Sequence, residues 1–146
     1  MKVVVANDHG AVELAQKVIA HLKGRGIEVT YLGTDSTESV DYPDQAEKAV
    51  LEYRKGGYDF GILMCGTGIG ISISANKMKG IRCALLQDTY AAEKTKQHNN
   101  SNFIAFGGRM EYKEKVEDII DAYIDSEFEG GRHEKRIAKM MALEGK

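Results

Sequence analysis

The chain has 146 residues, 42% of them hydrophobic, and its 20 basic and 22 acidic side chains give a net charge of −2. This balance offers no polycationic surface for nucleic acid or an anionic membrane, and no apolar run reaches the length of a membrane span. We therefore expect one cytoplasmic domain over residues 1–146, without a targeting segment. The two cysteines, Cys65 and Cys83, are too far apart for a metal-type pair or a disulfide framework, as is typical of a reducing compartment.

Short apolar runs alternate with stretches of helical periodicity along the whole chain. In chain order, the predicted elements are a strand at 2–6, a helix at 11–23, a strand at 28–32, a helix at 43–55, a strand at 60–64, a helix at 71–78, a strand at 82–86, a helix at 89–97, a strand at 103–106, and helices at 112–126 and 132–143. Pro43 suits a first helical turn, and Thr89 is the expected N-cap of its helix.

This alternation predicts an α/β fold, a single-domain three-layer α/β/α sandwich with a five-stranded parallel Rossmann-like sheet and an extra C-terminal helix. Ligands of such sheets bind at the carboxyl ends of the strands, where the strand order reverses. The strands at 2–6 and 60–64 would flank that point. We therefore expect the loop with Asp8 and His9 to meet the loop that begins at Cys65.

The loop Cys65-Gly-Thr-Gly-Ile-Gly70 places a thiol and three glycines between a buried strand and a helix. Glycines allow a ligand to approach the backbone N–H groups, and these groups with the helix dipole favour negative charge, including a thiolate at Cys65. Ile71 stands where a Walker loop needs Lys and a cysteine phosphatase needs Arg. The glycine spacing also differs from the dinucleotide-binding pattern. The four histidines show no ligand spacing with each other or with cysteine, so we expect no protein-bound metal. We also expect no cofactor.

Taken together, these features resemble the type B ribose-5-phosphate isomerases and the related allose- and galactose-6-phosphate isomerases. The resemblance extends over essentially the whole chain. It is carried by Asp8-His9, Val40-Asp-Tyr-Pro-Asp44, Cys65-Gly-Thr-Gly-Ile-Gly70 with Ser72-Ile-Ser-Ala-Asn-Lys77, Gly80-Ile-Arg82, Gln97-His-Asn99, Phe106-Gly-Gly-Arg109, and Phe128-Glu-Gly-Gly-Arg-His133 with Arg136.

The resemblance implies a metal-free aldose–ketose isomerisation of a phosphorylated sugar through an enediolate, in carbohydrate metabolism and the pentose phosphate pathway. Cys65 would move the proton between C1 and C2, Thr67 would relay a proton or orient the thiol, and His98 would open the sugar ring. The remaining residues would bind substrate. The backbone of Gly66, Gly68, Ile69 and Gly70 would stabilise the enediolate, Asp8, Tyr42 and Asn99 would hold sugar hydroxyls, and Arg109, Arg132, Arg136 and His9 would bind phosphate.

The helix before His98 runs back from the carboxyl edge of the sheet, so His98 should not reach Cys65 of its own chain. A two-fold homodimer whose tail, about residues 127–146, packs on the partner would join them. The resemblance also implies a homodimer that can pair into a tetramer. Two alternatives stay open: the same chemistry on allose or galactose 6-phosphate, and a noncatalytic sugar-phosphate sensor or nucleotide-binding module. We expect His21 at the surface and leave His133 open between a structural contact and a ligand.

Overall fold

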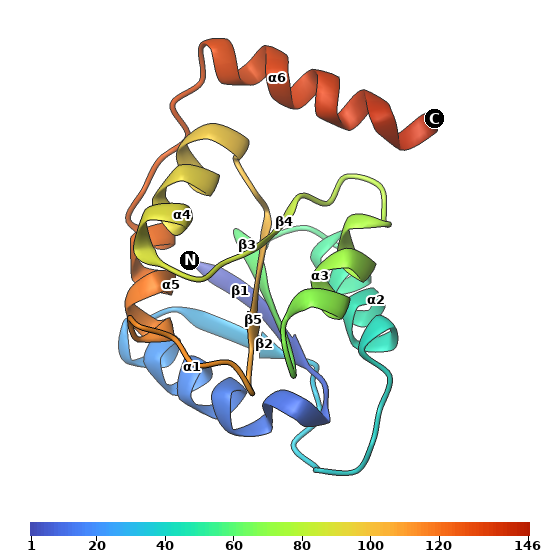
Figure 1. The fold of residues 1–146 in the computed structure, drawn as a ribbon, viewed down its shortest axis with the longest axis vertical. Coiled ribbons are helices and arrows are strands. Elements are labelled where there is room, and N and C mark those ends of the chain that lie inside the picture. Colours follow the sequence, from blue (N-terminus) through green and yellow to red (C-terminus); the bar gives the residue numbers. More distant parts are fainter.

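The computed structural model describes all residues, 1–146, and shows a twisted sheet between two layers of helices (Figure 1). The strands are β1 (Lys2–Asn7), β2 (Glu28–Tyr31), β3 (Phe60–Cys65), β4 (Cys83–Leu85) and β5 (Phe103–Gly107). The helices are α1 (Val12–Gly24), α2 (Tyr42–Tyr53), α3 (Ile69–Asn76), α4 (Thr89–Lys94), α5 (Val116–Ile124) and α6 (Arg132–Met141). A π-helical turn, Thr95–Asn99, extends α4. The predicted α/β sandwich with an extra C-terminal helix is confirmed.

All strand pairs are parallel, in the order β2-β1-β3-β5-β4. β1 lies between β2 and β3, so the strand order reverses between β1 and β3, as expected. The last strand, β5, inserts between β3 and β4 and leaves β4 at the edge of the sheet. Because of this insertion, the carboxyl ends of β1, β3 and β5 lie side by side, and Cys65 pairs with Gly107.

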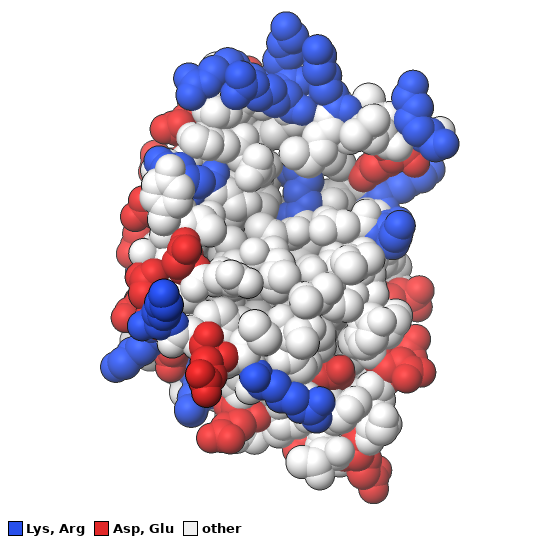
Figure 2. Space-filling model, viewed as in Figure 1, with Lys and Arg blue, Asp and Glu red and all other residues white.

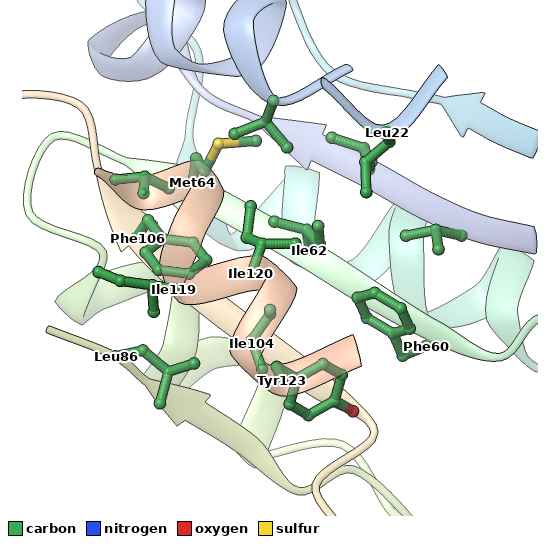
Figure 3. Close-up of a cluster of buried hydrophobic side chains, with 14 of the residues drawn as sticks. Leu22, Phe60, Ile62, Met64, Leu86, Ile104, Phe106, Ile119, Ile120 and Tyr123 are labelled. Carbon is green, nitrogen blue, oxygen red and sulfur yellow. The ribbon is translucent and has the colours of Figure 1, made fainter. Parts of the chain in front are cut away.

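Two apolar clusters, one on each face of the sheet, hold the layers together. Alternate residues of the strands pack against α1, α4 and α5 on one face, where Ile62, Phe106 and Tyr123 are fully or almost fully buried (Figure 3). The intervening residues, such as Val4 and Leu63, pack against α2 and α3 on the other face. Each such side chain contributes roughly 1.5–3 kcal/mol by leaving water. None of the helices has the combination of length and apolarity that crossing a bilayer requires.

Some predicted helix boundaries are wrong for identifiable reasons. Asp88, rather than Thr89, is the N-cap of α4, because its carboxylate accepts a hydrogen bond from the N–H of Ala91 at 2.7 Å. Helix α5 begins at Val116 instead of residue 112, since Lys115 is extended. Helix α3 begins two residues early, at Ile69. Figure 1 shows α6 lying across the amino edge of the sheet, opposite the edge where β5 ends.

Candidate active site

The loop after β3 curls back onto the sulfur of Cys65. Cys65 is 4% exposed, and its Sγ accepts a hydrogen bond from the N–H of Gly68 at 3.1 Å. Gly68 has a φ of +79°, and a Cβ atom at this position would lie 2.7 Å from the carbonyl carbon of Phe106. Only glycine fits this conformation and this space. The sequence therefore fixes a backbone amide against the thiol at the carboxyl edge of the sheet.

The turn after β5 holds this loop in place. The N–H groups of Gly108 and Arg109 donate to the carbonyl oxygens of Cys65 and Gly66, each at 2.8 Å. A Cβ atom on Gly66 would lie 3.5 Å from the guanidinium of Arg109, so this side chain lies beside the loop. Of the three arginines predicted to bind phosphate, Arg109 is therefore the one that lies at the same edge of the sheet as Cys65 of its own chain.

Tyr112 is a supporting residue that sequence reasoning missed, because its position reads as the start of a helix. Its hydroxyl oxygen accepts a hydrogen bond from the N–H of Gly107 at 2.7 Å. Burial raises the pKa of this hydroxyl. A Cβ atom on Gly107 would lie 2.6 Å from the backbone of Thr67, so Tyr112 stabilises the loop of Cys65 through Gly107.

The loop after β1 meets the loop of Cys65, as predicted. The N–H of Asp8 donates to Met64 at 3.0 Å, and its buried carboxylate accepts from Gly10 at 2.8 Å. This turn-capping contact is the structural role that such an aspartate most often has. A Cβ atom on Gly10 would lie 2.9 Å from the nitrogen of Gly66, so the two loops are in contact.

His9 and Tyr42 also lie at this edge. Nδ1 of His9 is 3.1 Å from the nitrogen of Val40, which donates to it in the tautomer protonated at Nε2. Two residues further on, the ring of Tyr42 packs against Gly70, where a Cβ atom would lie 2.6 Å from the ring. A cavity of about 290 Å³ adjoins this region, and its lining includes His9, Gly10, Thr37 and Gly108.

Two of the amides predicted to face a ligand instead form hydrogen bonds within the loop. The N–H of Gly68 donates to Cys65, and the N–H of Ile69 donates to the hydroxyl of Thr67 at 3.2 Å. Thr67 is exposed at the rim of the loop. The expectation that every amide from Gly66 to Gly70 points at substrate is therefore wrong for these two residues.

The other predicted site residues lie at the amino edge of the sheet. His98 and Asn99 are in the π-helical turn that precedes β5, whereas Gly107, beside Cys65, ends that strand. The five residues of β5 span about 16 Å at roughly 3.3 Å per residue. Arg132 and Arg136 lie exposed on α6, where basic side chains gather at the top of Figure 2. One chain therefore does not bring these four residues to Cys65.

His98 belongs to a cluster with His133 and Glu129. The two imidazole rings stack with centroids 4.2 Å apart, and Oε1 of Glu129 is 3.4 Å from Nε2 of His98 and 3.6 Å from Nε2 of His133. His133 is 4% exposed. Burial, together with the neighbouring His98, lowers the pKa of its imidazole. His21, which we expected at the surface, is part-buried and bonded to Asp121 at 2.7 Å.

A larger cavity, about 540 Å³, lies beneath α6 and not at Cys65. Its lining includes Arg82, Cys83, Asn99 and Met141. Arg82 donates to the carbonyl oxygens of Asn99 and Asn100 and so closes the π-helical turn. Cys83 is part-buried, and burial raises the pKa of its thiol.

Comparison with known proteins identifies the family of this chain. Residues 3–140 match the family model described as Ribose/Galactose Isomerase. Ribose-5-phosphate isomerase B of Escherichia coli K12 is 43% identical over 98% of this chain and 96% of its own. The solved ribose-5-phosphate isomerase B of Clostridium thermocellum shares its fold with a TM-score of 0.95 and is 42% identical, with coverage of 99% of this chain and 98% of its own. The solved ribose-5-phosphate isomerase B of Thermotoga maritima has a TM-score of 0.92 and is 47% identical, with coverage of 97% of each chain. The chain belongs to the ribose/galactose isomerase family and is an isomerase.

Proposed function

We propose that the protein interconverts ribose 5-phosphate and ribulose 5-phosphate, with Cys65 as the base. One observation carries the proposal: the sulfur of Cys65 lies where the loops after β1 and β3 meet, with the N–H of Gly68 donating to it. The similar proteins named ribose-5-phosphate isomerase B favour a pentose over a hexose substrate.

The reaction requires one proton to move between neighbouring carbons. As a thiolate, Cys65 would take the proton from C2 of the aldose, and the released electron pair would form the C1–C2 double bond of an enediolate. The resulting thiol would return the proton to C1, while a hydroxyl proton moves from O2 to O1. Cys65 is then a thiolate again, so the cycle is balanced. Thr67, exposed two residues after Cys65, would assist the transfer between the oxygens.

Different groups would bind the sugar and the phosphate of the substrate. Asp8 and Tyr42 would hold sugar hydroxyls close to the sulfur, and the backbone of Gly66, Gly68, Ile69 and Gly70 would shape the loop under C1 and C2. Arg109, at this edge, would bind phosphate with His9. His98, Asn99, Arg132 and Arg136 would complete the site from a second copy.

A symmetric homodimer would bring the two edges together. The face shown in Figure 2 has few charges at its centre, and the elements that form it in Figure 1 are α3, α4 and the edge strand β4. These elements carry exposed apolar side chains, including Ile73 at 54% and Tyr90 at 69%. Contact across a two-fold axis would cover this face and place residues 127–146 against the partner. A cytoplasmic location and pairing into tetramers stay predictions.

The test incubates the protein in deuterated water with each of a panel of phosphorylated pentoses and hexoses. NMR then measures product formation and the exchange of the hydrogen at C2. We expect formation of ribulose 5-phosphate from ribose 5-phosphate together with incorporation of deuterium. Preference for allose or galactose 6-phosphate in kcat/KM would support the hexose alternative. Binding of ribose 5-phosphate without exchange would contradict the proposal and favour a sugar-phosphate sensor.

A further inference from the structure

The cluster of His98, Glu129 and His133 at the amino edge has the side chains of a metal-binding site. His98, Glu129 and His133 each offer one ligand atom, and the three atoms lie within 4.8 Å of one another. Two imidazoles and one carboxylate are a ligand set that suits Zn²⁺ and leaves a fourth position open. From the sequence this set is invisible, because 35 residues separate the two histidines.

The separations fit an ion better than a direct hydrogen bond. In a tetrahedral zinc site, bonds of about 2.0–2.1 Å place neighbouring ligand atoms about 3.3 Å apart. The Glu129 oxygen is 3.4 and 3.6 Å from the two Nε2 atoms, whereas His21 and Asp121 approach to 2.7 Å in an ordinary hydrogen-bonded pair. The two separations from the Glu129 oxygen are therefore close to those of a tetrahedral site, and the two imidazole ligand atoms lie within 4.8 Å of each other.

An independent observation points to a missing partner. Nε2 of His133 is buried and has no hydrogen-bond partner. An unsatisfied buried polar atom costs free energy, so a ligand that satisfies it is favoured.

Backbone hydrogen bonds hold the main chain at two of the three ligand residues. The N–H of Glu129 donates to Gln97 at 3.0 Å, which ties Glu129 to the turn that carries His98. His133 is the second residue of α6, and its N–H donates to Gly130 at 3.1 Å. The rings are nearly parallel, so the part-exposed ring of His98 has to turn toward the ion.

We propose that His98, Glu129 and His133 bind one Zn²⁺-class transition-metal ion per chain. Arg132 and Arg136 lie close enough to oppose a cation, so we expect a Kd on the order of micromolar. Where the proposed function holds, the ion withdraws His98 from ring opening, and the site acts as a reversible inhibitory site. This consequence rests on the proposed function, whereas the binding itself does not.

Calorimetric titration of the full-length, metal-free protein with ZnCl₂ near neutral pH tests the site. We expect one saturable Zn²⁺ per chain, at least tenfold weaker binding by His133→Gln and by Glu129→Gln, and no such response to MgCl₂. His21→Gln is the matched control, because it removes another histidine with a carboxylate partner, and it should bind Zn²⁺ normally. Tetrahedral Co²⁺ absorption in the visible range should follow the same order.

The inference fails if no saturable binding occurs, or if His133→Gln and Glu129→Gln both bind as the wild type does. Loss of binding in Cys65→Ala, with binding retained in both cluster variants, would assign the ion to the thiol and overturn the proposal. Zn²⁺ should also inhibit isomerisation, and chelation should restore it. A protein that binds Zn²⁺ at the cluster but isomerises no sugar phosphate would refute the proposed function and leave this site standing.

Discussion

The two edges of the sheet are built in different ways. At the carboxyl edge, backbone hydrogen bonds and glycines hold the loop of Cys65, and the important side chains, Cys65 and Asp8, are buried. At the amino edge, side-chain contacts hold His98, and the arginines of α6 are exposed. At the carboxyl edge, an added methyl group should therefore lower the stability of the fold. At the amino edge, a substitution should change binding or catalysis and leave the stability of the fold unchanged.

The largest effect should come from the thiol itself. Cys65→Ala removes the proposed base but leaves the backbone of the loop unchanged, so kcat should fall on the order of a thousandfold without loss of folding. Steady-state assays of ribulose 5-phosphate formation check this. Cys83→Ala is the control, since Cys83 lies on β4 away from the loop, and it should keep its activity. Equal losses of kcat in both variants would contradict the proposal that Cys65 is the base.

The next effect concerns the conformation of the loop. In Gly68→Ala, a residue with a positive φ and a Cβ atom against Phe106 should lower the free energy of unfolding by about 2–4 kcal/mol. Urea unfolding at a fixed protein concentration measures this. Gly24→Ala at the end of α1 is the control, because nothing lies within 4 Å of the added atom and the change should stay below about 1 kcal/mol. Equal stabilities would show that the loop adjusts freely.

A smaller effect is expected from the basic face of α6. Arg136→Gln removes a proposed charged hydrogen bond to phosphate, worth about 1.5–3 kcal/mol, so KM should rise roughly tenfold or more while kcat changes little. Lys139→Gln, on the same helix, is the matched control and should leave KM unchanged. A fall in kcat at constant KM would argue against a role in phosphate binding.

The smallest effect is the pH dependence of stability. Because burial lowers the pKa of His133, the unfolded chain takes up a proton at a higher pH than the folded chain does. The free energy of unfolding should therefore decrease as the pH falls below about 6.5. His98, Glu129, Arg132 and Arg136 also face this ring and contribute to the shift. In His133→Gln this part of the slope should disappear; an unchanged slope would locate the effect elsewhere.

Sequence periodicity predicted the strands and most helices because their apolar residues repeat at the spacing of each element. The meeting of the Asp8 and Cys65 loops followed from the rule that parallel strands end at one edge. The insertion of β5 between β3 and β4 could not be predicted. A sheet with β4 next to β3 and β5 at the edge would show the same alternation of strands and helices along the sequence. Three contacts could not be predicted either: the stack of His98 on His133, the hydrogen bond of Tyr112 with Gly107, and the hydrogen bond from the N–H of Ile69 to Thr67. Each depends on packing between distant or locally irregular segments.

In the proposed dimer, each active site combines Cys65 of one chain with His98 of the other, and mixed dimers test this arrangement. Cys65→Ala and His98→Asn should each be nearly inactive as homodimers. After subunits are exchanged in equal amounts, half of the dimers should be mixed and contain one intact site, so activity should recover to about one quarter of the wild-type value. No recovery after verified subunit exchange would contradict the shared site and require both residues to act from one chain.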